Sequence, residues 1–158
     1  MRRKDREVVN KGDLLAILKG CPVCRLGLAV DDKPYVVPLN FGYTWEENEP
    51  LKLYFHSARE GLKLDMLTQN DLACFEIDGY HKLSVGENAC GYSYVYASII
   101  GWGRVRFLEE VEEKRRALNQ LMEHQTGSGG CVFNEAALTH TTMFYLEAEE
   151  ITGKRSQG

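Results

Sequence analysis

The sequence contains no long apolar run, no excess of positive charge and few cysteines, and each of these absences excludes a class of protein. No apolar stretch approaches the roughly 20 residues that a membrane-spanning helix needs, and the N-terminus lacks the apolar core of a secretory signal. The 158 residues carry a formal net charge of −4, which provides no basic face for a nucleic acid. We therefore expect a cytoplasmic protein that binds neither a membrane nor a nucleic acid.

The five cysteines are odd in number and scattered, which suits a reducing compartment better than a disulfide framework. Cys21 and Cys24 form the one CxxC pair. They follow Gly20, which is typical of a helix end, whereas redox CxxC pairs lie at a helix start, where the dipole lowers the thiol pKa. A structural zinc ion would need two further ligands, and no second CxxC or HxxxH spacing supplies them. We expect no metal site, and a redox role for the pair is the less favoured alternative.

The hydrophobic pattern predicts a single domain over residues 1–158, with flexible tails at 1–6 and 155–158. A chain of this length can bury about two thirds of its unfolded surface without staples, and no repeat or linker divides it. The pattern predicts helices over 13–20, 57–69 and 109–125, and strands over 25–30, 34–43, 51–55, 73–77, 94–107 and 143–151, followed by a polar tail. Six or so strands with helices at their edges predict a mainly β, α+β fold, a closed or nearly closed barrel.

Three local features refine this pattern. Asp13 is expected to cap the first helix, and Asp31, Asp32 and Lys33 have the composition of a hairpin turn. Both alternating faces of the 94–107 strand are largely apolar, so we expect both to be covered.

The segment that says most about function runs from the strand ending near Phe55 into the next helix. Ser57 and Glu60 have the spacing of a capping box, which predicts that the helix begins at about Ser57. A helix start directly after a strand presents N–H donors and a partial positive charge, which suits a phosphate. Gly61 permits a close approach, and Lys63 adds a full charge. The alternative is that the capping box only opens a helix and that Lys63 is an ordinary solvated side chain.

With these elements in place, the sequence resembles the pyridoxamine-phosphate-oxidase-like FMN-binding split barrels, in the branch of the nitroimidazole-resistance (Nim) proteins. The resemblance covers residues 6–154. It is carried by residues 24–28 (CRLGL), 34–43 (PYVVPLNFGY), 53–58 (LYFHSA) with Gly61 and Lys63, 96–103 (YASIIGWG) and 151–154 (ITGK).

The resemblance implies a six-stranded split β-barrel with peripheral helices that forms a homodimer, with FMN in a groove at the subunit interface. In such a protein, backbone groups of one strand would line the isoalloxazine ring. The next strand end would flank the ribityl chain and phosphate, Lys63 would neutralise the phosphate, and the long strand and the tail would contribute further contacts. The residues implied are Val36, Val37, Pro38, Leu39 and Asn40, then His56, Ser57, Ala58, Gly61 and Lys63, and finally Ser98, Ile99 and Lys154.

His56 is the candidate catalytic residue. In the Nim-like branch a histidine at this strand end lies near the flavin, where a neutral imidazole can contact substrate or assist proton transfer. The alternative is that His56 only packs at the strand end and bonds a backbone carbonyl. The other histidines, His81, His124 and His140, are expected on the surface without partners.

These observations favour an FMN-dependent oxidoreductase that passes electrons from NAD(P)H or a redox protein to a small organic acceptor, such as a nitroimidazole or another nitroaromatic. The sequence has no GxGxxG fingerprint, so a nicotinamide donor would bind transiently. True pyridoxamine phosphate oxidation is not expected, because the arginine-rich segment that holds its substrate is missing. The alternatives are a flavin-carrying or haem-carrying protein without turnover, and a metal or redox module built on Cys21 and Cys24.

Overall fold

A computed structural model describes residues 3–157 and contains one antiparallel sheet of eight strands in the order β3-β2-β6-β7-β8-β5-β4, with β1 added beside β8. The strands are β1 (Glu7–Val8), β2 (Val23–Val30), β3 (Lys33–Asn40), β4 (Gly42–Thr44), β5 (Lys52–Ser57), β6 (Leu72–Ser84), β7 (Ser93–Leu108) and β8 (Thr142–Ser156). The helices are η1 (Lys4–Arg6), α1 (Lys11–Gly20), α2 (Leu62–Gln69), η2 (Ala89–Gly91), α3 (Val111–Thr126) and α4 (Glu135–His140).

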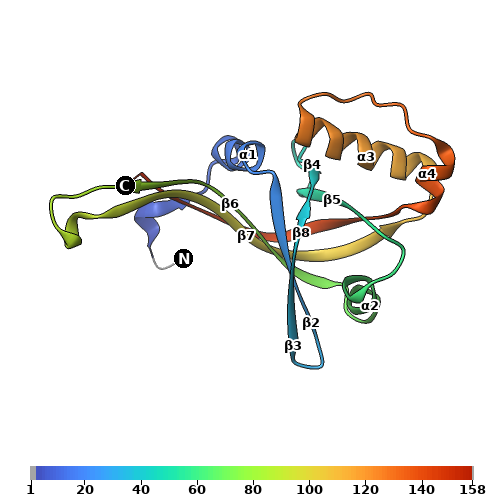
Figure 1. Ribbon diagram of the computed structural model, residues 1–158, viewed down its shortest axis with the longest axis horizontal. Coiled ribbons are helices and arrows are strands. Elements are labelled where there is room, and N and C mark those ends of the chain that lie inside the picture. Colours follow the sequence, from blue (N-terminus) through green and yellow to red (C-terminus); the bar gives the residue numbers. More distant parts are fainter. Residues whose placement is uncertain (1–2, 158) are drawn as a thin grey trace.

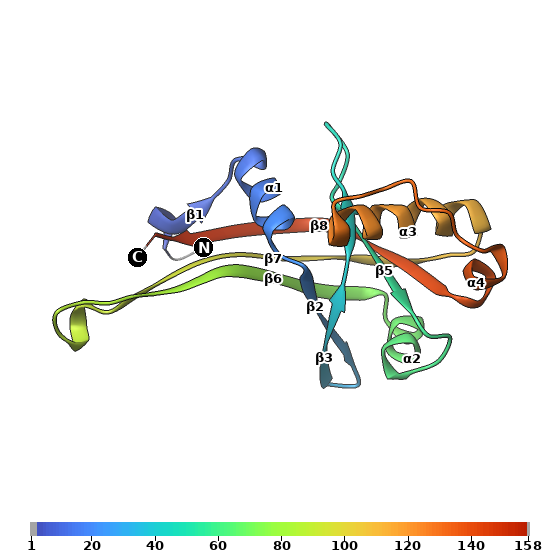
Figure 2. The same cartoon turned by 45° about the horizontal axis from the view of Figure 1, so that its top comes forward.

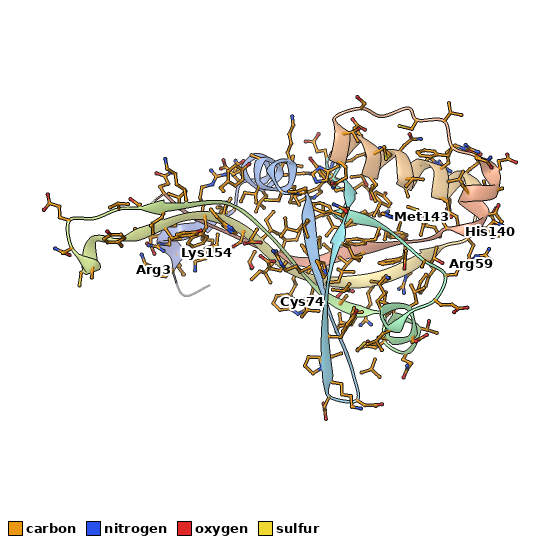
Figure 3. The ribbon with its side chains drawn as sticks, in the orientation of Figure 1. Arg3, Arg59, Cys74, His140, Met143 and Lys154 are labelled. Carbon is orange, nitrogen blue, oxygen red and sulfur yellow. The ribbon has the colours of Figure 1, made fainter. Side chains whose placement is uncertain are left out.

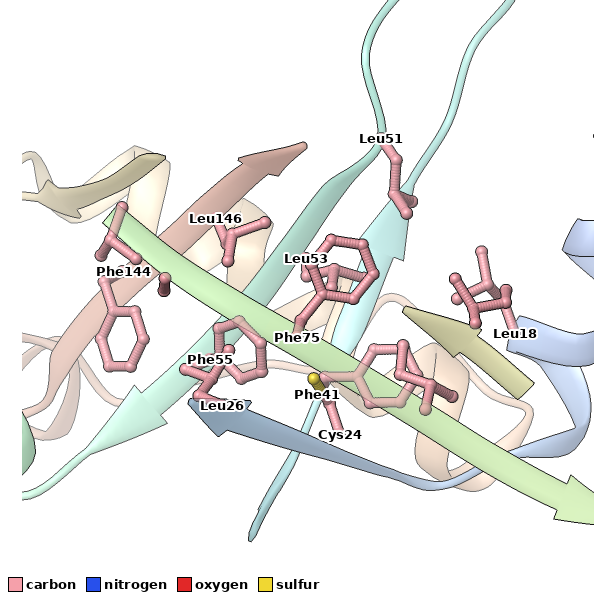
Figure 4. Packing of buried hydrophobic residues seen from close by; sticks show 14 of the residues in the cluster. Leu18, Cys24, Leu26, Phe41, Leu51, Leu53, Phe55, Phe75, Phe144 and Leu146 are labelled. Carbon is pink, nitrogen blue, oxygen red and sulfur yellow. The ribbon is translucent and has the colours of Figure 1, made fainter. Parts of the chain in front are cut away.

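The strands curl around one apolar core, into which β2, β5, β6 and β8 turn alternate side chains. The β2–β3 hairpin crosses the long β6 and β7 strands, and α3 and α4 cover one end of the sheet (Figure 1, Figure 2). Leu26, Phe55, Phe75 and Leu146 are fully buried where these strands face one another (Figure 4). Such alternation of buried and exposed positions along each strand is what places one face of a sheet on a core.

Beyond Gly79, the hairpin of β6 and β7 leaves the barrel as a long arm, seen on the left of Figure 1. The pairing shifts between Gly79 and Lys82, and Tyr80 there has a φ of 61°. A bulge of this kind bends a strand and strengthens its twist. The arm therefore has a different direction from the barrel wall, and α1 packs at its base.

The turn between β2 and β3 and the end of β3 test two local predictions. The predicted hairpin turn is present, but it consists of two residues, Asp31 and Asp32, with φ of 50° and 59°. Lys33, predicted as its third residue, is instead the first residue of β3. The predicted single strand 34–43 is wrong: it breaks at Phe41, whose side chain is fully buried. After this break the chain leaves β2, and Gly42 pairs with Tyr54 of β5 instead.

The two ends of the described chain contain regular secondary structure. Arg155 belongs to β8, which continues five residues past Ile151 because Lys154 pairs with Ser98 of β7 on one side and Glu7 of β1 on the other. Lys4–Arg6 form η1. Parts of both predicted tails therefore have regular secondary structure, while residues 1, 2 and 158, which also belong to the predicted tails, lie outside the described chain.

Helix ends were predicted less well than helix positions. Asn10, and not Asp13, caps α1: its Oδ1 accepts the N–H groups of Gly12 at 2.8 Å and Asp13 at 3.3 Å. The short helix α4 was not predicted. Within residues 3–157, none of the helices has both the length and the apolar character that crossing a membrane would require.

Candidate functional site

The corner between β5 and α2 differs from its prediction in a way that changes the site. Ser57 is the last residue of β5 and pairs with Thr142 of β8, so its backbone belongs to the sheet. The helix α2 begins only at Leu62, and its N-cap is Gly61, with a φ of 141°. Because L side chains rarely adopt that backbone conformation, Gly61 is required by the turn itself. The predicted capping box of Ser57 and Glu60 does not form.

Without the capping box, polar groups at this corner are left without partners. The Ser57 side chain is buried, with 8% of its surface exposed, and its Oγ has no hydrogen-bond partner in the described chain. No side chain in the part of the chain that the structure describes caps α2. The N–H groups of Leu64 and Asp65 donate to Gly61 O at 2.9 and 3.2 Å, which leaves those of Leu62 and Lys63 at the open end of the helix. A buried, unpaired hydroxyl costs roughly 1–3 kcal/mol, so the corner suits a ligand with acceptor oxygens.

The corner is held in place by α4 and carries a positive charge. Arg59 Nη2 donates to Thr139 O at 3.0 Å, and Figure 3 shows Arg59 beside the segment that carries His140. Lys63 is half-buried, and no carboxylate of residues 3–157 lies within 4.0 Å of its ammonium group. Its charge is therefore not neutralised by a salt bridge.

His56 lies one residue before Ser57 and on the opposite face of β5. Its side chain is exposed, while Met143, which pairs with it on β8, is fully buried. The ring forms no hydrogen bond to residues 3–157, so the alternative in which it bonds a backbone carbonyl is not observed. Ala58 is exposed beside it. The histidine is available to a bound molecule.

The strand β3 offers a second kind of binding surface, a free edge. Among residues 3–157 it pairs only with β2, and Val37 and Leu39 pack on the core while Val36 is 63% exposed. Antiparallel strands alternate between residues that bond the neighbour and residues whose backbone faces away. Pro38, which has no N–H, is tolerated at such an edge. Asn40 is already engaged: its Nδ2 donates to Pro22 O at 3.2 Å and to Gln125 Oε1 at 3.1 Å.

The remaining predicted residues lie far from this corner. His56 pairs with Met143, and Met143 pairs with Leu108 at the end of β7. Ser98 is ten residues from Leu108 along β7, a separation of about 33 Å at the usual rise of a strand. Ile99 is fully buried in the core, so its side chain faces away from any surface groove. A single chain thus divides the predicted residues into two distant groups.

The second group is centred on Lys154 of β8, which pairs with Ser98. Lys154 Nζ lies 5.4 Å from the centroid of the Tyr96 ring, and its proximity lowers the pKa of that tyrosine through hydrogen bonding. This part of β7 is also apolar on its outer face, where Tyr94, Ile100 and Trp102 are 48%, 40% and 42% exposed. The prediction that both faces of the strand are covered is wrong for the single chain.

Comparison with known proteins identifies the family of this chain. The model of the pyridoxamine 5'-phosphate oxidase family matches residues 10–155. The chain belongs to this family. The match confirms the resemblance seen in the sequence. A comparison with curated protein sequences finds no match.

Solved structures agree with this family assignment. A Bacteroides thetaiotaomicron protein assigned to 5-nitroimidazole antibiotic resistance is 33% identical, with a TM-score of 0.81 over 94% of this chain and 86% of that one. It supports a place in the nitroimidazole-resistance-like branch. The flavocytochrome Anf3 of Azotobacter vinelandii (18%, TM-score 0.79, 100% and 72% covered) and an FAD and haem binding protein of Mycobacterium smegmatis (18%, 0.80, 97% and 74%) share the fold. The split-barrel α+β fold is thereby confirmed.

Two histidines of this family member have partners that the sequence did not reveal. His124 is half-buried, its Nε2 lies 3.0 Å from Cys21 O, and its ring centroid is 4.5 Å from that of Phe41. Burial lowers the pKa of His124. His81 Nε2 lies 2.6 Å from Asp78 Oδ2. His81 is exposed, as predicted, but both histidines have partners, and His124 is not a surface residue. Only tertiary contacts supply these partners, so the sequence did not reveal them.

The CxxC pair does not have the surroundings of a redox site. Cys21 and Cys24 are both buried free thiols. Burial raises the pKa of Cys21 to about 11 and raises that of Cys24 as well, which is the opposite of what an attacking thiolate needs. No group of three His, Cys, Asp or Glu side chains in the described chain could hold a metal ion.

Proposed function

We propose that this protein is an FMN-dependent oxidoreductase that works as a homodimer and reduces a small organic acceptor. The observation that carries the proposal is the unpaired, buried Ser57 hydroxyl beside the uncapped start of α2. A family whose members bind flavins gives these groups a ligand. FMN, when bound, supplies reversible uptake of one or two electrons, and the protein supplies its position and electrostatics.

The phosphate group fits the β5–α2 corner. Ser57 Oγ can donate to one phosphate oxygen, and the N–H groups of Leu62 and Lys63 can donate to others. The Lys63 ammonium group, which lacks a carboxylate partner in the described chain, adds charge-assisted binding. The space beside Gly61 is open, because a Cβ added there would meet no atom within 4 Å. Without a side chain, Gly61 leaves this space free for the phosphate.

The ring system is proposed to lie along the free edge of β3. The backbone groups of Val36, Pro38 and Asn40 face away from β2 there, and a flavin carries matching donors and acceptors along one side of its ring. Val37 and Leu39 then serve as the packed support behind the edge. His56, exposed and without a partner in residues 3–157, is proposed to contact the acceptor and to deliver or take up a proton.

A second copy of the chain would bring the two distant groups together. Ser98 and Lys154 cannot reach the β5–α2 corner of their own chain, but the same groups of a partner related by two-fold symmetry can. The exposed apolar row Tyr94, Ile100 and Trp102 runs beside Ser98 on the same strand. Burying it stabilises a dimer through the hydrophobic effect. We therefore propose that flavin lies at the subunit interface.

The proposed donor is NAD(P)H or a redox protein, and the proposed acceptor is a nitroaromatic compound such as a nitroimidazole. The related protein from Bacteroides thetaiotaomicron, with its assignment to nitroimidazole resistance, supports this class of acceptor. All five cysteines are free thiols, which suits a reducing compartment such as the cytoplasm.

The test begins with the absorption spectrum of freshly purified protein and the mass of the cofactor released from it. FMN, bleached by NAD(P)H and reoxidised by a nitroimidazole, supports the proposal. Two structural relatives are a flavocytochrome and an FAD and haem binding protein. Release of FAD, or a haem spectrum, would therefore support a carrier of another cofactor. Flavin that never cycles with any donor supports a binding protein without turnover, and a protein that binds none of these contradicts the proposal.

The dimer is tested separately by light scattering. Trp102→Lys places a charge in the exposed apolar row and is expected to shift the protein from dimer to monomer and to reduce bound FMN. Val132→Lys is the matched control, because Val132 is 97% exposed and lies in the loop between α3 and α4. A wild-type monomer at micromolar concentration, or a Trp102→Lys dimer with full flavin content, contradicts the assembly.

A further inference from the structure

A groove lies between α3 and the outer face of the sheet, on the side opposite the core. α3 covers β4 and β5 at the upper right of Figure 1. Its backbone touches β4 at Gly42, where an added Cβ would come within 2.3 Å of Leu121 N. From this contact the groove runs beneath the two preceding turns of the helix, with a volume of about 500 Å³. That volume is in the range of small-molecule sites.

The floor of the groove is aromatic. Tyr54 of β5 and Tyr145 of β8 lie opposite each other on these two adjacent strands. Their ring centroids are 6.1 Å apart and their planes are inclined by 51°. The Tyr54 hydroxyl lies 3.0 Å from Thr44 Oγ1, whereas the Tyr145 hydroxyl has no partner in the described chain. Tyrosine rings offer apolar faces, and their hydroxyl groups need hydrogen-bond partners. The floor thus combines stacking surface with a free polar group.

The rim of the groove carries two cationic side chains, Lys52 and Arg116, of which only Lys52 is paired with a carboxylate of the described chain. Lys52 lies 5.5 Å from the centroid of the Tyr145 ring and 3.4 Å from Glu147. Arg116 of α3 donates only to the carbonyl of Glu112, at 3.3 Å, and has no carboxylate within 4.0 Å in residues 3–157. Glu113 is the one acidic residue in the lining. An anionic group at this rim would therefore meet at least one cation that is not already paired.

We propose that this groove is a second small-molecule site, specific for a planar aromatic carboxylate. The ring would rest on Tyr145, and the carboxylate would accept hydrogen bonds from Arg116 and Lys52. The groove is built from α3 and the outer face of β4, β5 and β8, whereas the groups proposed for the phosphate lie beyond the end of β5. His56 lies on the same outer face, two residues past Tyr54, so the titration with FMN decides whether the two sites are separate.

The test uses 4-hydroxybenzoate as the probe, titrated by calorimetry into the protein as purified and again with excess FMN. The expected result is saturable binding of one probe per chain, unchanged by FMN, with the uncharged 4-hydroxybenzamide at least about threefold weaker. Arg116→Gln is expected to weaken the carboxylate about threefold to fivefold, the scale of a partly exposed ion pair. Lys114→Gln removes the same charge from the same helix outside the groove, and it is expected to leave binding unchanged.

Several outcomes would overturn the proposal. Binding that is absent or not saturable removes the site, and competition by FMN assigns the probe to the flavin groove instead. Equal losses in Arg116→Gln and Lys114→Gln would mean that only the net charge attracts the probe. Equal affinity for the carboxylate and the amide would show that the cationic rim plays no part.

Discussion

Replacing Ser57 by alanine should have opposite effects on the free protein and on its complex with FMN. In the free chain the hydroxyl is buried and has no hydrogen-bond partner in the described residues, so it has lost its water without compensation. Removing an unsatisfied polar group of this kind recovers part of a penalty of roughly 1–3 kcal/mol. The small void left by one oxygen offsets some of this gain. We expect the flavin-free Ser57→Ala protein to be more stable by about 1 kcal/mol.

FMN binding should change in the other direction. If Ser57 Oγ donates to a phosphate oxygen, its loss removes a hydrogen bond to a charged group, worth roughly 1.5–3 kcal/mol. The dissociation constant should therefore rise by about 10-fold to 150-fold. Thr68→Ala is the matched control. The Thr68 hydroxyl already donates to Leu64 O at 2.8 Å within α2, so its removal should leave FMN affinity unchanged.

Two measurements test these predictions for Ser57→Ala. Thermal unfolding of the flavin-free proteins, at equal chain concentration, should show Ser57→Ala melting about 2–4 °C above wild type. Titration of FMN, followed by the quenching of its fluorescence, should show the loss of affinity. A destabilised flavin-free variant would mean that Ser57 has a partner after all, and an unchanged affinity would place the phosphate elsewhere.

Three further predictions concern charge and protonation. Lys63→Ala should weaken FMN binding by about 1.5–3 kcal/mol, and Lys63→Arg should keep most of the affinity; equal losses in a fluorescence titration would contradict a role of the charge. Burial lowers the pKa of His124, so as the pH falls below about 6.5 the unfolded chain is protonated before the folded one, and the free energy of unfolding should decrease until the folded pKa is reached. In urea unfolding at a series of pH values, His124→Asn should remove this decrease. Since burial raises the pKa of Cys21 to about 11 and raises that of Cys24, iodoacetamide at pH 8 should label the exposed Cys90 first by mass spectrometry, and early labelling of the buried pair would revive a redox role.

The sequence was informative where the determining interactions are local. Asp31 and Asp32 occupy the turn that their composition predicts, because the conformation needed there depends on the two residues themselves. Alternation along β7 correctly assigned Ala97 and Val105 to the buried face. The order of the short motifs was enough to identify the family.

Local spacing failed where a distant strand competes for the same backbone. Ser57 and Glu60 have the spacing of a capping box, but pairing with Thr142 holds Ser57 in β5 and delays the helix to Leu62. Similarly, the polar residues after Ile151 lack the pattern of a strand, and they form one because both β7 and β1 bond to them.

The candidate site was predicted as a set of residues, and only the tertiary structure decided how that set is divided. The sequence alone determined the family and the mainly β architecture, and it marked residues 57–63 as the candidate segment for binding a phosphate. It could not place Ser98 and Lys154 at the far end of the sheet from His56, since that distance follows from the registers of β5, β7 and β8. Registers are set by packing across the whole sheet, and they also decide that Tyr94, Ile100 and Trp102 are left exposed on β7.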